Sequence, residues 1–311
     1  MSIMFKKLFL PVGMCLVVLV ALLTPAPGLW LKENIGTSAM IMAIFLISGM
    51  QADFRELQLG KRFFGGLLLG GLFTLAILSF MGWGMLFATP LDPMLLAGLL
   101  VMLAAPPTLS SGIVMTVQAQ GNMMLAVAIT VLFNLGAILT LPIVLGFLLS
   151  EAAADGVDAW QMFRSLIVLV LIPLFIGYTA RRFLLRGRWH KTMDYIPLLA
   201  TLALIGVIFS TARTAILSLP WSMLILVLAL CGIFHLAAMA GLWGIGRLVK
   251  MNAGECKAMV FCGASKSATM ALAMVAIADL GATAAVVPCL LFYALQMLMD
   301  SLLSGYARRF R

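Results

Sequence analysis

The sequence predicts an all-α integral membrane protein with ten transmembrane helices, and composition is the first reason. Of the 311 residues, 64% are hydrophobic and only 10% are charged, with a mean hydropathy of +1.16. A soluble domain carries about 25% charged residues, because its surface must face water. Most of this exterior is therefore expected to face lipid. A span needs roughly 20 apolar residues, so ten spans with short connections account for one membrane domain, 1–311.

The second reason is the spacing of the apolar runs. The first run follows Lys6 and Lys7 and also resembles a signal peptide. However, the stretch 24–28 after it is a helix stop rather than an A-x-A cleavage site, so we expect the segment to stay. Charged residues and Gly/Pro punctuation predict spans at 8–27, 35–51, 63–88, 93–118, 122–149, 163–184, 193–212, 219–247, 255–279 and 283–305.

The third reason is the distribution of the 20 basic residues. With the N-terminus in the cytoplasm, 16 of them fall on the cytoplasmic side, three fall outside, and Lys266 lies within a span. This asymmetry predicts a multi-pass protein of the cell inner (plasma) membrane with both termini in the cytoplasm. The net charge of +9 is spread over short clusters between apolar runs, so it does not predict a groove for nucleic-acid phosphates.

The chain also predicts an internal repeat. An acidic stretch at 150–158 leaves five spans on each side, and because five is odd, the second half enters from the opposite side of the membrane. That is the inverted-repeat plan of many secondary transporters. We place repeat one at about 1–149 and repeat two at about 163–311, with the amides Asn134 and Gln296 near mid-membrane in spans five and ten. The alternative is that any ten apolar helices look alike.

Spans four and nine carry the polar residues that are most costly in lipid. Pro106 and Pro107 remove two backbone donors and predict a break in span four. Gly263 and the serines beside it mark a weak point at the same depth of span nine. Lys266 lies about 11 residues, or roughly 16 Å, from the start of that span. The alternative to a functional Lys266 is a lysine that snorkels to an interface.

A lysine at the bilayer centre costs about 3 kcal/mol on insertion scales. Where two helices break near the midplane, their C-terminal ends expose carbonyls that attract a cation, and their N-terminal ends expose amides that attract an anion. We therefore expect spans four and nine to cross at their breaks. The carbonyl ends should receive the Lys266 ammonium, which would occupy the place of a bound sodium ion.

Further polar side chains recur at helical spacing on spans five and ten, where they are expected to face the bundle interior. Each could bind a solute or only hold helices together. Asp300 is expected to pair with a basic residue near the cytoplasmic end. His235 in span eight could relay protons or hydrogen-bond a neighbour, and we favour the second. The five cysteines are scattered without metal-ligand spacing, so we expect no metal site.

Two groups of residues carry a resemblance to a known family. One group, in spans four and five, is Pro107-Thr108-Leu109, Ser111-Gly112, Thr116, Gly121-Asn122, Thr130, Asn134-Leu135-Gly136 and Pro142. The other, in span nine, is Ser265-Lys266-Ser267. Together they resemble the bile acid:sodium symporter superfamily, and most closely its SBF-like branch. The resemblance implies two inverted five-helix repeats, forming a panel domain and a core domain whose fourth and ninth helices cross where they unwind.

The resemblance also implies organic-anion substrates, often driven by sodium. The glutamate and glutamine that bind sodium in span nine of such symporters fall near Cys262 and Lys266 here. The fourth-helix Ser-Asn pair falls near Ser111 and Gly112, and of the fifth-helix hydroxyls only Thr130 is kept. The resemblance therefore places a candidate sodium site near Ser111 and Thr130, while these departures argue against sodium coupling.

We expect a secondary active transporter of a small organic anion, with sodium or a proton as the candidate coupling ion. We expect no other cofactor, no catalytic residue and no obligatory protein partner besides solute and membrane lipid. Lys266 would be either a fixed cation or a group that exchanges a proton in each cycle. The alternatives are a passive channel, an intramembrane enzyme and a retinal-type photoreceptor. The candidate substrate- and ion-binding residues are Thr108, Ser110, Ser111, Thr130, Asn134, Cys262, Ser265, Lys266, Ser267 and Gln296.

Overall fold

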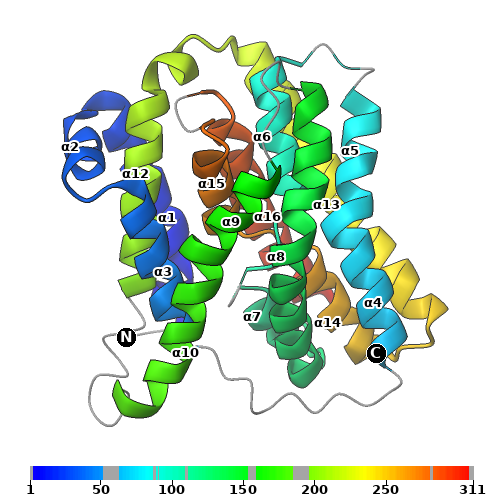
Figure 1. Ribbon diagram of the computed structural model, residues 1–311. Coiled ribbons are helices and arrows are strands. Elements are labelled where there is room, and N and C mark those ends of the chain that lie inside the picture. The colour runs from blue at the N-terminus through cyan, green and yellow to red at the C-terminus, as the bar shows by residue number, and fades with distance from the viewer. Residues whose placement is uncertain are drawn as a thin grey trace. The chain divides into compact units, whose positions relative to one another are not determined.

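The structure is a computed structural model. It describes residues 3–51, 63–86, 89, 91–108, 111–152, 159–184, 196–280 and 283–307. Over these residues the secondary structure is helical and contains no strand (Figure 1). Seven described helices are long and apolar enough to cross a membrane, or up to eight if one bent pair counts as a single span. The chain is therefore an all-helical, multi-pass membrane protein.

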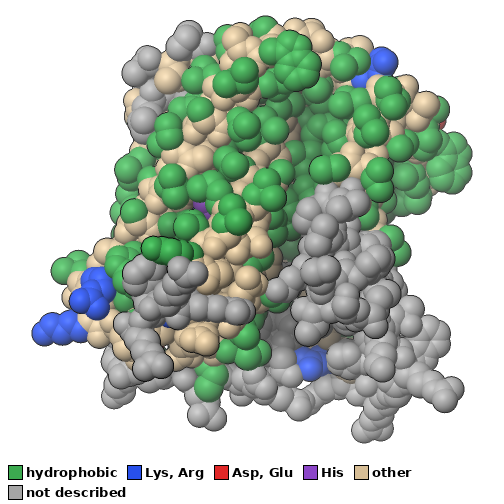
Figure 2. All heavy atoms as spheres, turned by 180° about the vertical axis from the view of Figure 1, so that it is seen from behind, with side chains coloured by type: hydrophobic (Ala, Val, Ile, Leu, Met, Phe, Trp, Pro, Cys, Tyr) green, Lys and Arg blue, Asp and Glu red, His purple; other side chains and the backbone are tan. Residues whose placement is uncertain are grey.

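The surface agrees with this reading. Among the residues coloured in Figure 2, hydrophobic side chains cover much of the upper part of the face, and the Lys and Arg side chains lie towards its upper and lower ends. Large apolar side chains are exposed on several helices: Trp221 is 81% exposed, Leu248 75% and Ile143 72%. Such exposure would be costly in water and is favourable against lipid tails.

The chain divides into two compact units. The first is formed by 1–53, 160–218 and 272–286, and the second by 54–159, 219–271 and 287–311. The helices of the first unit are α1 (Ile3–Leu23), α2 (Ala26–Asn34), α3 (Thr37–Gln51), α9 (Ala159–Leu166), the π-helical segment η3 (Ile167–Leu171), α10 (Ile172–Leu184) and α12 (Ile196–Leu217).

In the first unit, glycines let α3 and α10 approach backbone to backbone. A Cβ atom on Gly49 would collide with the carbonyl oxygen of Leu174, and one on Gly177 would collide with that of Leu46. Small residues at contacts of this kind are typical of helix packing in membranes, where close approach gains dispersion energy. This unit carries none of the candidate binding residues.

The first predicted span, 8–27, lies earlier in the chain than expected, because α1 runs from Ile3 to Leu23. The helix α1 ends at Leu23, and α2 leaves it at an angle of 97°. Pro25 and Pro27 explain the bend, because proline lacks an N–H donor and disfavours helix in the residue before it. The Nε of Arg213 donates a 2.7 Å hydrogen bond to the Leu22 carbonyl that the bend leaves open.

The second unit holds the candidate site. Its helices are α4 (Phe64–Leu72), the π-helical segment η2 (Phe73–Ile77), α5 (Leu78–Leu86), α6 (Pro93–Ala104), α7 (Ser111–Gln118), α8 (Met123–Ala152), α13 (Trp221–Leu248), α14 (Ala253–Gly263) and α16 (Val286–Ala307). The helix α15 (Ala268–Ile277) begins in this unit and is divided between the two.

Predicted spans four and nine are each broken into two helices. In span four, α6 begins at Pro93 under an Asp92 cap and ends at Ala104, where Ala105 turns to an extended conformation with φ −58° and ψ 143°. A residue before proline favours that conformation. In span nine, α14 begins with a reciprocal Asn252–Glu255 capping box and ends at Gly263 without a proline. Every residue from 99 to 105 is fully buried, so the break in span four lies in the core.

Candidate functional site

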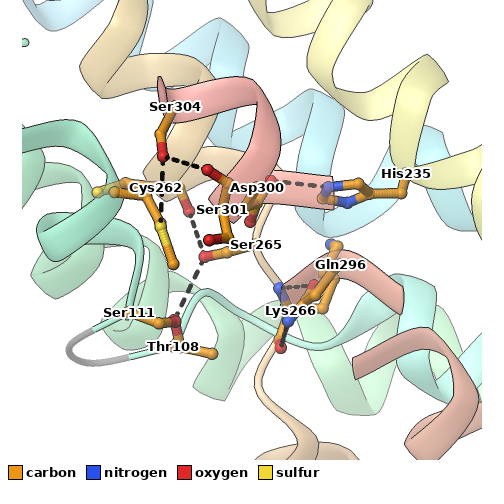
Figure 3. Close-up of polar contacts among 11 residues, drawn as sticks. Thr108, Ser111, His235, Cys262, Ser265, Lys266, Gln296, Asp300, Ser301 and Ser304 are labelled. Atoms are coloured by element: carbon orange, nitrogen blue, oxygen red, sulfur yellow. Dashed lines mark hydrogen bonds and ion pairs between the residues drawn. The ribbon is translucent and has the colours of Figure 1, made fainter. Parts of the chain in front are cut away.

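The two breaks lie against each other (Figure 3). The Ser267 amide donates a 2.8 Å hydrogen bond to the Pro106 carbonyl, so the backbone of one break pairs directly with the backbone of the other. The hydroxyls of Thr108 and Ser265 lie 3.4 Å apart across the same contact. The expectation that the fourth and ninth spans meet where they break is therefore met within this unit.

Gly112 permits this contact at the start of α7. A Cβ atom there would lie 2.9 Å from the Phe261 carbonyl oxygen, 3.0 Å from the Cys262 Cα and 3.1 Å from the Ser265 hydroxyl. Two of these three neighbours are backbone atoms, which cannot rotate away. The resemblance to sodium symporters places an asparagine near Gly112. An asparagine at this position would add a whole side chain to the contact, so the glycine helps the two breaks to fit together.

Lys266 places its ammonium among backbone carbonyls. Its side chain is fully buried, and Nζ donates to the carbonyl oxygens of Thr74 at 2.6 Å, Leu103 at 2.6 Å and Ala105 at 3.0 Å, with the Thr74 hydroxyl at 3.1 Å. The Leu103 carbonyl is open because its helical donor would be the N–H of Pro107, which has none. No carboxylate is among the described acceptors of this ammonium, so its positive charge is compensated only by dipoles.

Thr74 is the residue that the sequence reasoning missed. It lies in η2, where the Leu78 N–H donates to the Phe73 and Ala76 carbonyls and leaves the Thr74 carbonyl for Lys266. Its hydroxyl donates to the Gly263 carbonyl at 2.7 Å and so covers the end of α14. Segments of π-helix commonly occur at functional sites, but a threonine in a Gly-rich span gave no signal of one.

Two amides hold the backbones of the breaks. Asn134 Nδ2 on α8 donates to the Pro107 carbonyl at 3.0 Å and to the Thr130 carbonyl at 2.7 Å. Gln296 on α16 makes two bonds to one residue: its Nε2 donates to the Lys266 carbonyl at 2.7 Å, and its Oε1 accepts from the Lys266 amide at 2.8 Å. These are the amides that the sequence singled out on spans five and ten.

A group of hydroxyls and one thiol lies beside the ammonium site. The Thr108 hydroxyl makes a short hydrogen bond with Ser111. Ser265 donates to the Cys262 carbonyl at 3.1 Å, and the Thr116 hydroxyl lies 3.6 Å from the Cys262 sulfur. These side chains form one polar cluster that lies over the Gly112 contact, with Lys266 pointing away from it toward the carbonyls.

The other candidates have more local partners. Thr130 donates to the Ala126 carbonyl at 2.9 Å on its own helix. The Ser267 hydroxyl accepts from the Met270 amide at 3.3 Å and caps the start of α15. Ser110 lies outside the described residues. The ammonium of Lys266 has no hydrogen bond with Ser111 or Thr130 over the described chain, so it lies at the carbonyl ends rather than in the candidate sodium site near those hydroxyls.

Asp300 pairs with a different partner from the one expected. Its Oδ1 lies 2.9 Å from His235 Nε2, and both side chains are only 1% exposed. The expectation was a lysine or arginine near the cytoplasmic end. His235 meets the favoured expectation, since it hydrogen-bonds a neighbour on another helix.

Comparison with protein families matches residues 9–309 to the SBF-like CPA transporter family. The chain belongs to this family. The match covers nearly the whole chain and includes both breaks, the two amides and Lys266. None of the curated proteins matches the chain significantly. As an SBF-like CPA transporter, the protein is a membrane transporter, which agrees with the branch that the residues of spans four, five and nine resemble.

Proposed function

We propose that this transporter is a secondary active carrier of a small organic anion whose cycle does not use a sodium gradient. The Lys266 ammonium is the observation that carries the proposal. It takes three backbone carbonyl oxygens and one hydroxyl, and oxygens of this kind replace the hydration shell of alkali cations in other membrane proteins. A cation joined to the chain by a covalent tether cannot leave with the solute, so the carbonyl site that it fills cannot draw energy from a sodium gradient.

The charge at the site favours an anionic solute. The ammonium has no described carboxylate partner, and α7 and α15 both begin next to the touching breaks. The amides at such helix starts attract negative charge, and the hydroxyl pair of Thr108 and Ser111 can donate to a carboxylate or sulfonate oxygen. Because every N–H of the ammonium has an acceptor, we infer that Lys266 stays charged and that transport runs as uniport or exchange with respect to this group.

The proposal includes ten spans in two inverted repeats, about 1–149 and 163–311. Three pairs of features support it. Each half has a polar span that breaks near its middle, and each of these two breaks is held by an amide on the following span, Asn134 or Gln296. Each broken span also ends in the same turn: Gln120 and Asp279 both have φ 58°, and the amides that follow them bond back five residues, to Thr116 and Val275.

We also propose that the protein lies in the cell inner membrane with both termini in the cytoplasm. The support is the distribution of basic residues, 16 of which then lie on the cytoplasmic side. A fluorescent reporter that folds only in the cytoplasm, fused at the C-terminus, should be bright. An exported enzymatic reporter at the same position should be inactive, and the reverse result would contradict this orientation.

Uptake by purified protein in liposomes tests the transport proposal. We expect saturable uptake and counterflow for at least one member of a panel of carboxylates, sulfonates and bile-acid-like anions, with and without sodium and a pH gradient. Flux that does not saturate and shows no counterflow would indicate a passive channel instead. An intramembrane enzyme is disfavoured because the Ser265 hydroxyl donates to the Cys262 carbonyl and the Lys266 ammonium contacts carbonyls, so among the described serines none hydrogen-bonds the Lys266 amine.

A further inference from the structure

A second polar pair lies inside the same unit, on helices that the Lys266 site does not use for its ammonium. His235 is on α13 and Asp300 is on α16, and Nε2 and Oδ1 are 2.9 Å apart (Figure 3). The His235 ring lies edge-on against Phe292, with ring centroids 5.8 Å apart and an interplanar angle of 89°. Both helices are candidate membrane spans, and both side chains are only 1% exposed, so the pair is buried inside this unit.

The pair keeps two polar atoms open. His235 Nδ1 and Asp300 Oδ2 are buried and have no hydrogen-bond partner over the described residues. Most buried polar atoms in proteins are paired, and an exception calls for an explanation. If the pair were only a connection between helices, one bond would suffice and the two open atoms would be a cost. A proton that binds and leaves, or a water molecule that carries it, would give both atoms a partner.

The open nitrogen defines the proton step. In the proton-poor form, Nε2–H donates to the Asp300 carboxylate, Nδ1 holds a free electron pair, and the pair has a net charge of −1. A proton from water binds at Nδ1 and forms an N–H bond, which leaves an imidazolium beside a carboxylate and a net charge of zero. Release breaks that N–H bond and returns the proton to water. The neutral form is favoured in an apolar interior, so loss of the proton must be linked to a change in the surroundings.

Few other charged groups face the pair. The helices α4, η2, α5, α6 and α7 carry no titratable side chain over their described residues. Gln296, one turn from Asp300, binds the Lys266 backbone. The titratable groups on the helices that carry or contact the pair are Cys231, Arg247, Glu255, Cys256, Lys257, Cys262, Lys266, Cys289, Tyr293 and Tyr306.

We propose that His235 and Asp300 form a proton-binding site that takes up and releases one proton in each transport cycle. This inference rests on the proposed function and deepens it, because it gives a transporter with a fixed Lys266 cation a separate group for coupling to pH. Asp300 is one turn along α16 from Gln296, which holds the break at Lys266. A change in charge at Asp300 can therefore act on the break through a single helix turn.

The titration of His235 can be observed directly, because the chain has only two histidines. In the full-length His190→Gln protein labelled with ¹⁵N-histidine, every imidazole signal belongs to His235. We expect its two nitrogen shifts to change over the pH range in which the protein stays folded, because the proton binds at Nδ1. In Asp300→Asn on this background the transition should shift or vanish. The control Asp279→Asn removes an exposed carboxylate at a positive φ that asparagine tolerates, and it should leave the transition in place.

Constant His235 shifts over this range, or a transition that is identical with and without Asp300, would overturn the inference. Neither result depends on a solute. The coupling is then measured as anion uptake driven by a pH gradient, in the sodium-free liposomes of the screen above. We expect Asp300→Asn and His235→Gln to lose the stimulation by the gradient and to keep counterflow. If the unmodified protein carries no anion at all, the proposed function is wrong. The NMR result on proton binding at His235 would still stand.

Discussion

The ammonium of Lys266 lies 2.6 Å from the carbonyl oxygen of Leu103, a residue 163 positions earlier in the chain. The contact exists because Pro107 has no N–H to offer that carbonyl. One helix break thus creates an acceptor, and the second break supplies the cation that fills it. The pairing ties the two breaks together electrostatically at a point where neither helix can complete its own backbone bonds.

Replacement of Lys266 by alanine is expected to abolish transport. Lys266→Ala removes the ammonium from the carbonyl ends and takes a hydrogen-bond donor from three carbonyls, each a cost of roughly 1–3 kcal/mol. Anion uptake in liposomes should fall to the level of empty liposomes. Gel filtration and thermal unfolding of the purified variant separate loss of transport from loss of folding. Full uptake by a folded Lys266→Ala protein would show that the ammonium is not needed.

Replacement of Lys266 by glutamine separates hydrogen bonding from charge. The amide of Lys266→Gln can donate to the open carbonyls but carries no charge, so we expect it to restore solute binding at most and not transport. Binding is measured as protection of the purified protein against thermal unfolding by the anion found in the uptake screen. Normal transport by this variant would contradict the role of the fixed charge.

Thr74 is expected to stabilise the site through its hydroxyl. Thr74→Val keeps the shape of the side chain but removes the donor to the Gly263 carbonyl and an acceptor of the Lys266 ammonium. We expect a loss of about 1 kcal/mol in the free energy of unfolding, with Thr74→Ser near the unmodified value. Thr140→Val is the matched control, since the buried Thr140 hydroxyl has no partner over the described residues. Equal effects at 74 and 140 would contradict this role.

Gly112 is expected to tolerate no side chain. A Cβ atom in Gly112→Ala meets the Phe261 carbonyl oxygen at 2.9 Å and the Cys262 Cα at 3.0 Å, and the strain from such overpacking is typically about 1–3 kcal/mol. Both the melting temperature and the uptake rate should fall. Gly244→Ala on α13 is the control, because a Cβ atom there meets nothing within 4 Å. A Gly112→Ala protein as stable as the control would mean that the two breaks can move apart at little cost.

Much of the site was predictable, because its main signals are local. Pro106 and Pro107 break a helix wherever they occur, and an amide or lysine deep in an apolar run must find a polar partner. These rules predicted the broken spans, the capture of Lys266 by carbonyls and the inward-facing amides Asn134 and Gln296. The same apolar runs predicted where most of the described helices lie, but α12 ends at Leu217 rather than at 212 and α1 bends into α2.

The remaining features depend on tertiary structure. The π-helical turn that frees the Thr74 carbonyl arises from packing, and the residues 73–77 are ordinary for an α-helix. The partner of Asp300 was equally hidden: His235 is 65 residues away, and both a basic loop residue and a buried histidine satisfied the sequence.

The most direct test is anion uptake into liposomes under imposed sodium gradients, at fixed pH and fixed membrane potential. The membrane potential is held fixed because it can by itself drive an anion across the membrane. With Lys266 held by the carbonyls of Leu103, Ala105 and Thr74, we expect the uptake rate to be the same with an inward sodium gradient, an outward gradient and no sodium. A steep, saturable dependence on sodium in the unmodified protein would contradict the tethered cation and place the chain among sodium-driven symporters.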